Sequence, residues 1–332
     1  MTEIHLSEHE LRPERCLLSV PATTDRFFPK AAASEADTIM LDLEDAVAPD
    51  LKEEGRARAI AALNELDWGA KTMCVRINGL DTQWAYRDLI ELGEACPRLD
   101  VLMVPKLERP EEVHAVATFL QGVELATQRQ KPIGIEVLIE TALGMVNVEA
   151  IAASHPRLES ISFGPGDYSA SMGNRSQLIG GPDPDYTVLT YPDGEGRRER
   201  HWNDVWHAAL SRIATACRAH NIRALDGPYP DFNDPEGFQA SARRAVSLGF
   251  VGKWAIHPSQ VTLANEIFGP TPEEVSYANR LMEALQQAKG EGKGAVTLDG
   301  KMIDLAHARQ AQRILAQAER ISAQQGKGED VR

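Results

Sequence analysis

Residues suited to chemistry stand where short apolar runs of this chain end. Arg76 follows one such run, Glu140 closes another, and Asp167 follows two closely spaced glycines. A buried carboxylate is costly unless a positive group meets it. One arginine and two carboxylates at a common site would suit a general acid/base pair, or the oxygen ligands of a divalent cation such as Mg²⁺.

A second acidic group adds negative charge to this candidate site. Asp42, Glu44 and Asp45 follow another apolar run. So many carboxylates require a cation, which favours a metal held by Glu140 and Asp167 over an acid/base pair. We interpret the other three carboxylates as the surroundings of that metal.

The alternative is a purely structural ion pair. Arg76 would then form a buried salt bridge with Glu140 or Asp45 and have no further function. Gly164 and Gly166 weigh against this alternative, because glycine lets the backbone approach a bound group closely.

Short apolar runs alternate with longer amphipathic segments along the chain. Apolar strands separated by helices predict a parallel sheet whose outer face is covered. Eight such repeats favour a closed (β/α)8 barrel of the α/β class over an open doubly wound sheet. The predicted strands are Cys16–Val20, Thr38–Glu44, Thr72–Ile77, Val101–Lys106, Ile133–Glu140, Ser160–Phe163, Ile222–Asp226 and Lys253–His257, and the clearest predicted helices are Leu51–Leu66, Gln83–Ala95, Glu111–Gln128 and Glu236–Leu248.

In a barrel, these elements would bring the reactive residues together. Barrel enzymes place their reactive groups at the C-terminal ends of the strands. Arg76, Glu140 and Asp167 follow the third, fifth and sixth predicted strands. We therefore expect their side chains to converge at one mouth of the barrel.

Two segments are predicted as additions to the eight strand–helix repeats of the barrel. Residues 168–201 are rich in Gly, Pro and Asp without helical periodicity, which is typical of a lid inserted in the barrel domain, residues 1–268. Residues 269–332 are predicted to form two helices, the first opened by Thr271 and Pro272, around a short strand and turn. A glycine-rich hinge makes this arm a candidate for packing on a neighbouring subunit; the alternative is a cap on its own barrel.

Composition narrows the class of protein. The formal charge of −14 over 332 residues argues against non-specific binding of nucleic acid, which needs a basic surface. The four cysteines are far apart and form no C-x-x-C pair, so we expect reduced, mostly buried thiols. The sequence has neither a signal peptide nor an apolar stretch of 18 residues, which predicts a cytoplasmic protein without membrane contact.

Several long motifs resemble one family of enzymes. The motifs are Leu41-Asp42-Leu43-Glu44-Asp45-Ala46-Val47-Ala48-Pro49, Val75-Arg76-Ile77-Asn78-Gly79-Leu80-Asp81-Thr82, Glu136-Val137-Leu138-Ile139-Glu140-Thr141-Ala142-Leu143-Gly144 and Gly252-Lys253-Trp254-Ala255-Ile256-His257-Pro258. They resemble the CoA-ester lyases related to the citrate lyase β subunit, in the HpcH/HpaI aldolase superfamily. Within that group the chain is most similar to the L-malyl-CoA/β-methylmalyl-CoA lyases, over nearly its whole length.

The resemblance implies a barrel enzyme that uses Mg²⁺, with Mn²⁺ as a substitute, and a coenzyme A thioester as substrate. Its expected reactions are the reversible cleavage of malyl-CoA to acetyl-CoA and glyoxylate, and of β-methylmalyl-CoA to propionyl-CoA and glyoxylate. It also implies a homohexamer built from trimers. By the same resemblance, Glu140 and Asp167 are the metal ligands, Arg76 binds substrate, and Asp304 of a neighbouring subunit is the acid.

The same resemblance implies substrate and CoA contacts at a further set of positions. Relatives sometimes carry a basic residue where this chain has Thr24, so Arg26, from the next turn, is the expected substitute. His257 has a structural alternative, because a histidine before proline often only forms local hydrogen bonds. The expected contacts, besides Arg76 and Asp167, are Ser19, Thr24, Arg26, Lys30, Gly166, Ile256 and His257.

The motifs are also compatible with other activities. A related lyase for citramalyl-CoA or a malyl-CoA thioesterase would carry similar motifs. A non-catalytic subunit that binds CoA esters within a larger lyase complex is the alternative from another class. Intact Arg76, Glu140, Asp167 and Asp304 argue against that subunit.

Overall fold

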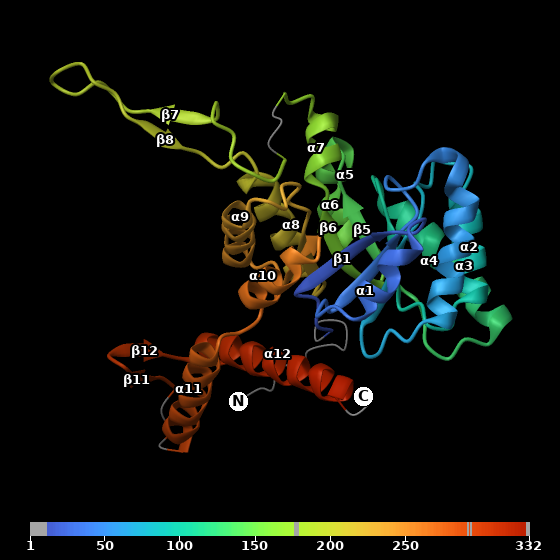
Figure 1. The fold of residues 1–332 in the computed structure, drawn as a ribbon. Helices are drawn as coiled ribbons and strands as arrows, with labels where there is room; N and C mark the ends of the chain where they lie inside the picture. Colours follow the sequence, from blue (N-terminus) through green and yellow to red (C-terminus); the bar gives the residue numbers. More distant parts are fainter. Residues whose placement is uncertain (1–11, 176–178, 291, 293, 330–332) are drawn as a thin grey trace.

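The computed structural model describes residues 12–175, 179–290, 292 and 294–329. Eight parallel strands close into a barrel in the order β1-β10-β9-β6-β5-β4-β3-β2 (Figure 1). This confirms the predicted (β/α)8 barrel and excludes the open sheet. The barrel strands are β1 Cys16–Pro21, β2 Thr38–Asp42, β3 Thr72–Arg76, β4 Val101–Val104, β5 Gly134–Ile139, β6 Leu158–Phe163, β9 Arg223–Asp226 and β10 Gly252–Ala255.

Alternating side chains divide the buried residues between two cores. Leu17, Met40, Cys74, Leu138 and Trp254 belong to one cluster, which fills the inside of the barrel. The residues between them along the strands belong to a larger cluster between the strands and the outer helices. Successive residues of a strand point to opposite faces, so the next inward positions after Met40, Cys74 and Leu138 are the ones that reach the barrel mouth.

Helices surround the barrel on its outer side (Figure 1). One helix start shows the capping chemistry clearly: Asp234 accepts a hydrogen bond from the backbone N–H of Gly237 at 2.9 Å, with Pro235 at the first helical position. The helices that begin at Lys52 and Ala85 have no side-chain cap among the described residues. The helices and 3₁₀ turns of the barrel are η1 Asp25–Phe27, α1 Phe28–Ala32, η2 Pro49–Leu51, α2 Lys52–Glu65, α3 Ala85–Ala95, α4 Pro110–Thr127, α5 Ala142–Val146, α6 Val148–Ala152, α7 Pro165–Met172, α8 His207–Ala219, α9 Pro235–Leu248 and α10 Ser259–Phe268.

The segment predicted to lack helical structure, residues 168–201, begins inside a helix. The helix α7 runs to Met172 and ends at Gly173, which has a φ of 68°, so the prediction was wrong for its first residues. Strands β7 Thr187–Leu189 and β8 Arg200–Trp202 then pair in an antiparallel hairpin. In Figure 1 this hairpin projects away from the barrel. Residues 176–178 of the segment lie outside the described residues.

The C-terminal segment follows the predicted order of elements. Helix α11 spans Pro272–Gly290, strands β11 Val296–Leu298 and β12 Lys301–Ile303 form a hairpin, and helix α12 spans Leu305–Glu329. The two helices and the hairpin share their own apolar cluster, including Leu281, Leu285 and Ile303. Residues 291 and 293 of the predicted glycine hinge lie outside the described residues.

Helix α12 also contacts its own barrel. The Gln317 amide donates to the carbonyl of Phe268, and the Gln324 amide donates to the carbonyl of Ala70 at 3.3 Å. Ala70 lies just before β3, so α12 lies at the N-terminal ends of the strands. All four cysteines are free and buried, as predicted. Among the described residues, no helix is both long and apolar enough to cross a membrane.

Candidate active site

A buried ion pair links two neighbouring strand ends at the barrel mouth. Asp42 ends β2, Arg76 ends β3, and the two residues are paired across the strands. Arg76 donates from Nε and Nη2 to both oxygens of Asp42 at 2.8 and 2.6 Å. Its Nη1 lies 2.8 Å from Oε2 of Glu44 and 3.5 Å from Oδ2 of Asp45. The structural alternative from the sequence is therefore partly correct, since Arg76 is in a buried ion pair, chiefly with Asp42.

Glu140 stands one residue beyond β5, at the turn into α5. Its side chain points inward, and the residue is only 2 % exposed. Gly164, one residue beyond β6, lies directly against it: a Cβ atom there would sit 2.5 Å from both Cβ and Oε2 of Glu140. The missing side chain of Gly164 is what leaves room for this carboxylate.

Lys106 joins Glu140 to the remaining acidic residues. Its backbone N–H donates to Oε1 of Glu140 at 2.9 Å. Its ammonium group lies 2.5 Å from Oε1 of Glu44, 3.4 Å from Oδ1 of Asp45 and 3.7 Å from Oδ2 of Asp167. The structure thus brings Glu140 and Asp167 to the same lysine, and Asp167 lies in the first turn of α7.

Burial and excess negative charge set the protonation of the site. Burial, followed by the charge of Glu44, raises the pKa of Glu140 well above its usual value, while Arg76 opposes that shift. Burial raises the pKa of Glu44 as well. For Lys106, burial favours the neutral form, yet the bond with Glu44 outweighs it and raises the pKa of the ammonium. The lysine is therefore a permanent cation of the site.

The two carboxylates Glu140 and Asp167 would suit a divalent cation that keeps part of its water shell. No group of three or more His, Cys, Asp or Glu suited to a metal occurs among the described residues. Mg²⁺ needs only one or two carboxylates, with waters and substrate completing its shell. Five carboxylates, Asp42, Glu44, Asp45, Glu140 and Asp167, are gathered around Arg76, Lys106 and Lys52, so the site would carry an excess of two negative charges with all five ionised.

The repulsion between Glu140 and Asp167 supports the same fit. The negative neighbours that raise the pKa of Glu140 include Asp167. A metal ion between these two carboxylates would relieve the repulsion between them.

Sequence reasoning missed two residues of this site. Lys106 is the last residue of the predicted strand Val101–Lys106. Its position at a strand end is the one feature that indicates a site residue. Trp254, on β10, lies under Arg76 with its ring centre 5.6 Å from the guanidinium carbon, and its Nε1–H donates to Ser162. Stacking and ion pairing together hold the guanidinium in one plane.

Four of the predicted CoA contacts lie on β1 and on the segment that follows it. Ser19 is on β1 and half-buried, as is Thr24 before η1. Arg26 and Lys30 are exposed on η1 and α1, with the Arg26 guanidinium 5.0 Å from the ring centre of Phe27. These two cations are available to a ligand at the rim.

The remaining predicted contacts have local partners. Gly166 is near Ile179, whose Cδ1 would lie 3.8 Å from a Cβ at that position. The backbone N–H of Ile256 donates to Gln260, so it is not available to a ligand in this conformation. His257 bonds Ser259 through Nδ1 and stacks on Phe232, which is the structural alternative raised for this histidine. Strand β10 ends at Ala255, two residues before the predicted end.

Asp304 lies away from this mouth within the same chain. It precedes α12, in the arm at the opposite end of the barrel (Figure 1). Its carboxylate is exposed and accepts from the N–H of Ala306, and the bond with His307 lowers its pKa. His307, its partner, was also missed from the sequence.

The fold and this mouth define a class of protein. It is a (β/α)8 barrel enzyme with a buried arginine and a carboxylate pair at the C-terminal strand ends. Residues 15–258 match the family described as HpcH/HpaI aldolase/citrate lyase, and the chain belongs to this family. The resemblance inferred from the motifs is confirmed.

Three relatives show how closely the chain follows this family. It is 49% identical to an L-malyl-CoA/beta-methylmalyl-CoA lyase of Cereibacter sphaeroides, covering 94% of this chain and 96% of that protein. It is 36% identical to a malyl-CoA/beta-methylmalyl-CoA/citramalyl-CoA lyase of Chloroflexus aurantiacus, covering 96% and 91%. The crystal structure of CitE from Mycobacterium tuberculosis with magnesium, acetoacetate and coenzyme A is 28% identical, with a TM-score of 0.69 and coverage of 93% and 99%.

Proposed function

We propose that this protein is a magnesium-dependent carbon–carbon lyase that cleaves malyl-CoA to acetyl-CoA and glyoxylate, and β-methylmalyl-CoA to propionyl-CoA and glyoxylate, in a reversible reaction. The observation that carries the proposal is the gathering of Arg76, Glu140 and Asp167 at one barrel mouth around Lys106. The name of the relative that is 49% identical supports the substrate.

Negative charge develops on substrate oxygens during the reaction, and positive groups at the barrel mouth can stabilise it. Cleavage transfers the proton of the 3-hydroxyl group to a base and breaks the bond between the hydroxyl-bearing carbon and the carbon next to the thioester carbonyl. The bonding electrons pass to the acyl-CoA fragment as an enolate, which then takes a proton on carbon. A fixed positive donor beside the developing oxyanion favours this step.

Arg76 is the donor best placed for that role. A guanidinium carries five N–H donors; the pairing with Asp42 uses two of them, and Nη1 also lies 2.8 Å from Glu44. Asp42 and the Trp254 ring fix the plane of the group, so the remaining hydrogens have a set direction. Its buried position strengthens any hydrogen bond to substrate oxygen.

Glu140 and Asp167 are the proposed ligands of the metal. When bound, Mg²⁺ supplies a Lewis acid for the carboxylate and the adjacent oxygen of the glyoxylate unit; Mn²⁺ is the expected substitute. Removing divalent ions with EDTA should abolish glyoxylate release, and added Mg²⁺ should restore it. Full activity of metal-free protein would overturn the metal assignment.

Asp304 is the proposed acid that protonates the enolate carbon, donated by a neighbouring subunit. The position of Asp304 in the arm, away from its own barrel mouth, supports such an arrangement. The lowered pKa of the exposed carboxylate does not suit an acid, but burial in a neighbour's site would raise it. Closure by the arm, residues 269–332, and by the hairpin in residues 168–201 would also exclude water from the enolate.

Exposed apolar side chains support self-association, for which we propose a homohexamer. Met302 and Leu305 flank Asp304 and are 68% and 57% exposed, while Trp202 on the β7–β8 hairpin is 63% exposed. Apolar groups of this size on projecting elements are typical of protein interfaces. Sedimentation of the purified chain would measure the assembly.

Product analysis distinguishes this function from its alternatives. A thioesterase would release free malate and CoA without glyoxylate, whereas a citramalyl-CoA lyase would release pyruvate. The name of the relative that is 36% identical includes citramalyl-CoA, so that substrate belongs in the same assay. A non-catalytic binding subunit would bind acyl-CoA but release no product as an isolated homo-oligomer.

A further inference from the structure

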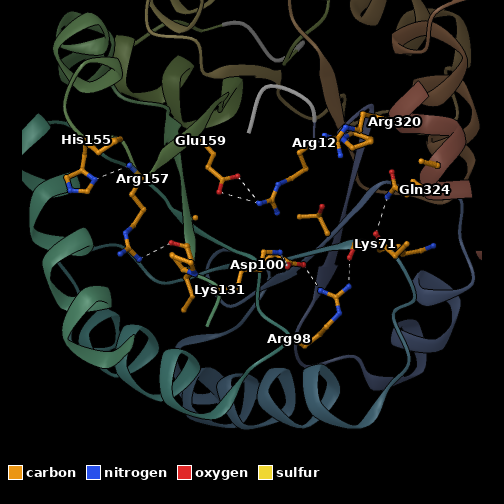
Figure 2. A pocket seen from close by; sticks show the side chains of 18 residues that line it. Arg12, Lys71, Arg98, Asp100, Lys131, His155, Arg157, Glu159, Arg320 and Gln324 are labelled. Atoms are coloured by element: carbon orange, nitrogen blue, oxygen red, sulfur yellow. Dashed lines mark hydrogen bonds and ion pairs between the residues drawn. The ribbon is translucent and has the colours of Figure 1, made fainter. Parts of the chain in front are cut away.

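A cavity of about 840 Å³ lies at the N-terminal end of the barrel, opposite the candidate active site. Its wall includes Thr72 and Gly134, which start β3 and β5, and Glu159 near the start of β6. Helix α12 completes the wall with Arg320 and Gln324 (Figure 2). The cavity therefore lies between the barrel and the C-terminal arm.

The side chains around this cavity are strongly basic. Two carboxylates, Asp100 and Glu159, face six cations: Arg12, Lys71, Arg98, Lys131, Arg157 and Arg320. Glu124, behind the wall, pairs with Arg157 through both oxygens. Even without Lys71, the five other cations outnumber these three carboxylates by two, in a chain whose formal net charge is −14.

The two carboxylates serve to hold cations in place. Asp100 accepts from Lys131 at 2.6 Å and from Arg98 at 2.5 Å. Burial opposes the charge of Asp100, but these bonds outweigh it and lower the pKa of the carboxyl. Glu159 is 2% exposed and pairs with Arg12 at 3.2 Å. Asp100 and Glu159 therefore fix cations in the cavity wall, and Arg98 is held further by the carbonyls of Gly69 and Lys71, to which its Nη2 donates.

The backbone of the barrel is shaped around this arrangement. A Cβ atom on Gly134 would lie 2.2 Å from Oε1 of Glu159, so only glycine leaves room for the carboxylate that holds Arg12. The Lys131 side chain is 62% exposed and the Arg98 side chain 33% exposed. The Lys131 ammonium can thus reach a ligand without breaking its pair with Asp100.

Helix α12 supplies Arg320, a cation whose charge is not balanced by a neighbouring carboxylate among the described residues. Arg320 is exposed and forms no ion pair with any residue in the described part of the chain. Gln324, one turn further, donates to the carbonyl of Ala70. A ligand bound to Arg320 and to the barrel cations would therefore connect the arm to the barrel.

We propose that this cavity binds a small multivalent anion, bearing phosphate groups or several carboxylates, and that the bound anion fixes α12 against the barrel. Guanidinium and ammonium groups on several sides recognise such oxygens by charge-assisted hydrogen bonds. A singly charged anion would neutralise only part of the excess charge. The proposal does not depend on the lyase function, because the cavity and the mouth lie at opposite ends of the barrel.

Calorimetric titration of the full-length, metal-free protein tests the site, with inorganic pyrophosphate and tricarballylate as the two probes. We expect at least one probe to bind. Arg320→Gln combined with Lys131→Gln should weaken that binding about tenfold or more, since each removed cation costs a charge-assisted hydrogen bond. The probe that binds more tightly identifies phosphate or carboxylate as the preferred chemistry.

Two controls separate this cavity from other cationic surfaces. Arg309→Gln removes the same charge from α12 outside the cavity and should leave the affinity unchanged. Arg26→Gln combined with Lys30→Gln should also leave it unchanged, because those cations lie at the other end of the barrel. Circular dichroism of each variant verifies its fold; all five positions are solvent-exposed, so folding should persist.

Hydrogen exchange provides a readout specific to the arm. The bound anion should slow exchange of the α12 amides around Arg320 in the wild type and not in the variant lacking both cavity cations. Absence of binding by both probes at physiological ionic strength would overturn the proposal. Equal affinity of wild type and that variant, or unchanged exchange in α12, would overturn it as well.

Discussion

The backbone N–H of Lys106 donates to Oε1 of Glu140 at 2.9 Å, and this bond depends on an unusual backbone conformation. Lys106 has a φ of 51°, in the left-handed region that side chains other than glycine rarely adopt. The conformation turns the N–H towards Glu140 while the ammonium reaches Glu44, Asp45 and Asp167. One residue thus organises both proposed metal ligands. Such backbone outliers are concentrated at functional sites.

Replacement of Lys106 by methionine should strengthen metal binding. The substitution keeps the side-chain length but removes the cation near Asp167 and Glu44, so a divalent ion would meet a more negative site. We expect the affinity for Mg²⁺, measured by calorimetry, to rise roughly tenfold. Lys301→Met, on β12, is the matched control and should not change it. A weaker affinity in Lys106→Met would show that the lysine helps to form the site instead of competing with the ion.

Gly164→Ala should disturb the site by steric overlap. The new Cβ would lie 2.5 Å from Glu140 Oε2, closer than any ordinary contact. We expect a loss of about 1–3 kcal/mol of stability, as for other overpacked positions, together with weaker Mg²⁺ binding. Gly122→Ala on α4 has open space around it and should be neutral or slightly stabilising. Chemical denaturation of both variants compares them directly; equal stability would contradict the packing argument.

Asp304→Asn should lose turnover while retaining affinity for acyl-CoA. The asparagine keeps the shape of the side chain but cannot donate the proton, so we expect a decrease in kcat of roughly 10²- to 10⁴-fold. Asp299→Asn, in the same arm and paired with Arg280, is the control and should remain active. Near-normal turnover of Asp304→Asn would remove this residue from the mechanism.

Mixing two inactive variants tests whether the acid comes from a neighbouring subunit. Glu140→Gln should be inactive for lack of a metal ligand, and Asp304→Asn for lack of the acid. Mixed oligomers formed by joint refolding would contain some sites with both intact residues, and activity should return in part. Failure to recover activity in mixed oligomers of verified composition would argue that each site is built from one chain.

Glu136, inside the barrel, should make stability depend on pH. Burial, with the charge of Glu14, raises the pKa of Glu136 to about 8, although hydrogen bonds from Ser160 and Ser162 oppose the shift. Between pH 4.5 and 8, Glu136 is therefore protonated in the folded state but ionised in the unfolded chain, where its pKa has the ordinary value of 4.5. Stability should therefore fall as the pH rises from about 4.5 to 8, by up to about 1.4 kcal/mol per pH unit from this group.

Glu136→Gln removes this titration and keeps a similar shape. The free energy of unfolding of the variant should show a weaker decline over that pH range and exceed that of the wild type at pH 8. Glu236→Gln, in the first turn of α9, is an exposed control. An unchanged pH profile in Glu136→Gln would show that the carboxyl is ionised in the folded protein.

The sequence by itself determined the barrel and the positions of its reactive residues. Apolar strands alternating with capped helices specify a parallel sheet covered by helices, and eight repeats close it. The alternation of side chains along a strand then fixes direction: Asp42, Arg76 and Glu140 each stand an even number of residues after an inward-facing core residue. Local periodicity suffices for these conclusions.

Only the tertiary structure decided which charges meet. Lys106 pairs with Glu44 across 62 positions of the chain, through a backbone conformation that no local pattern indicates. The basic cavity combines residues from Arg12 to Gln324, which no motif connects. Pairings of this kind depend on loop conformations and on the packing of distant segments, so they follow from the three-dimensional arrangement and not from residue spacing.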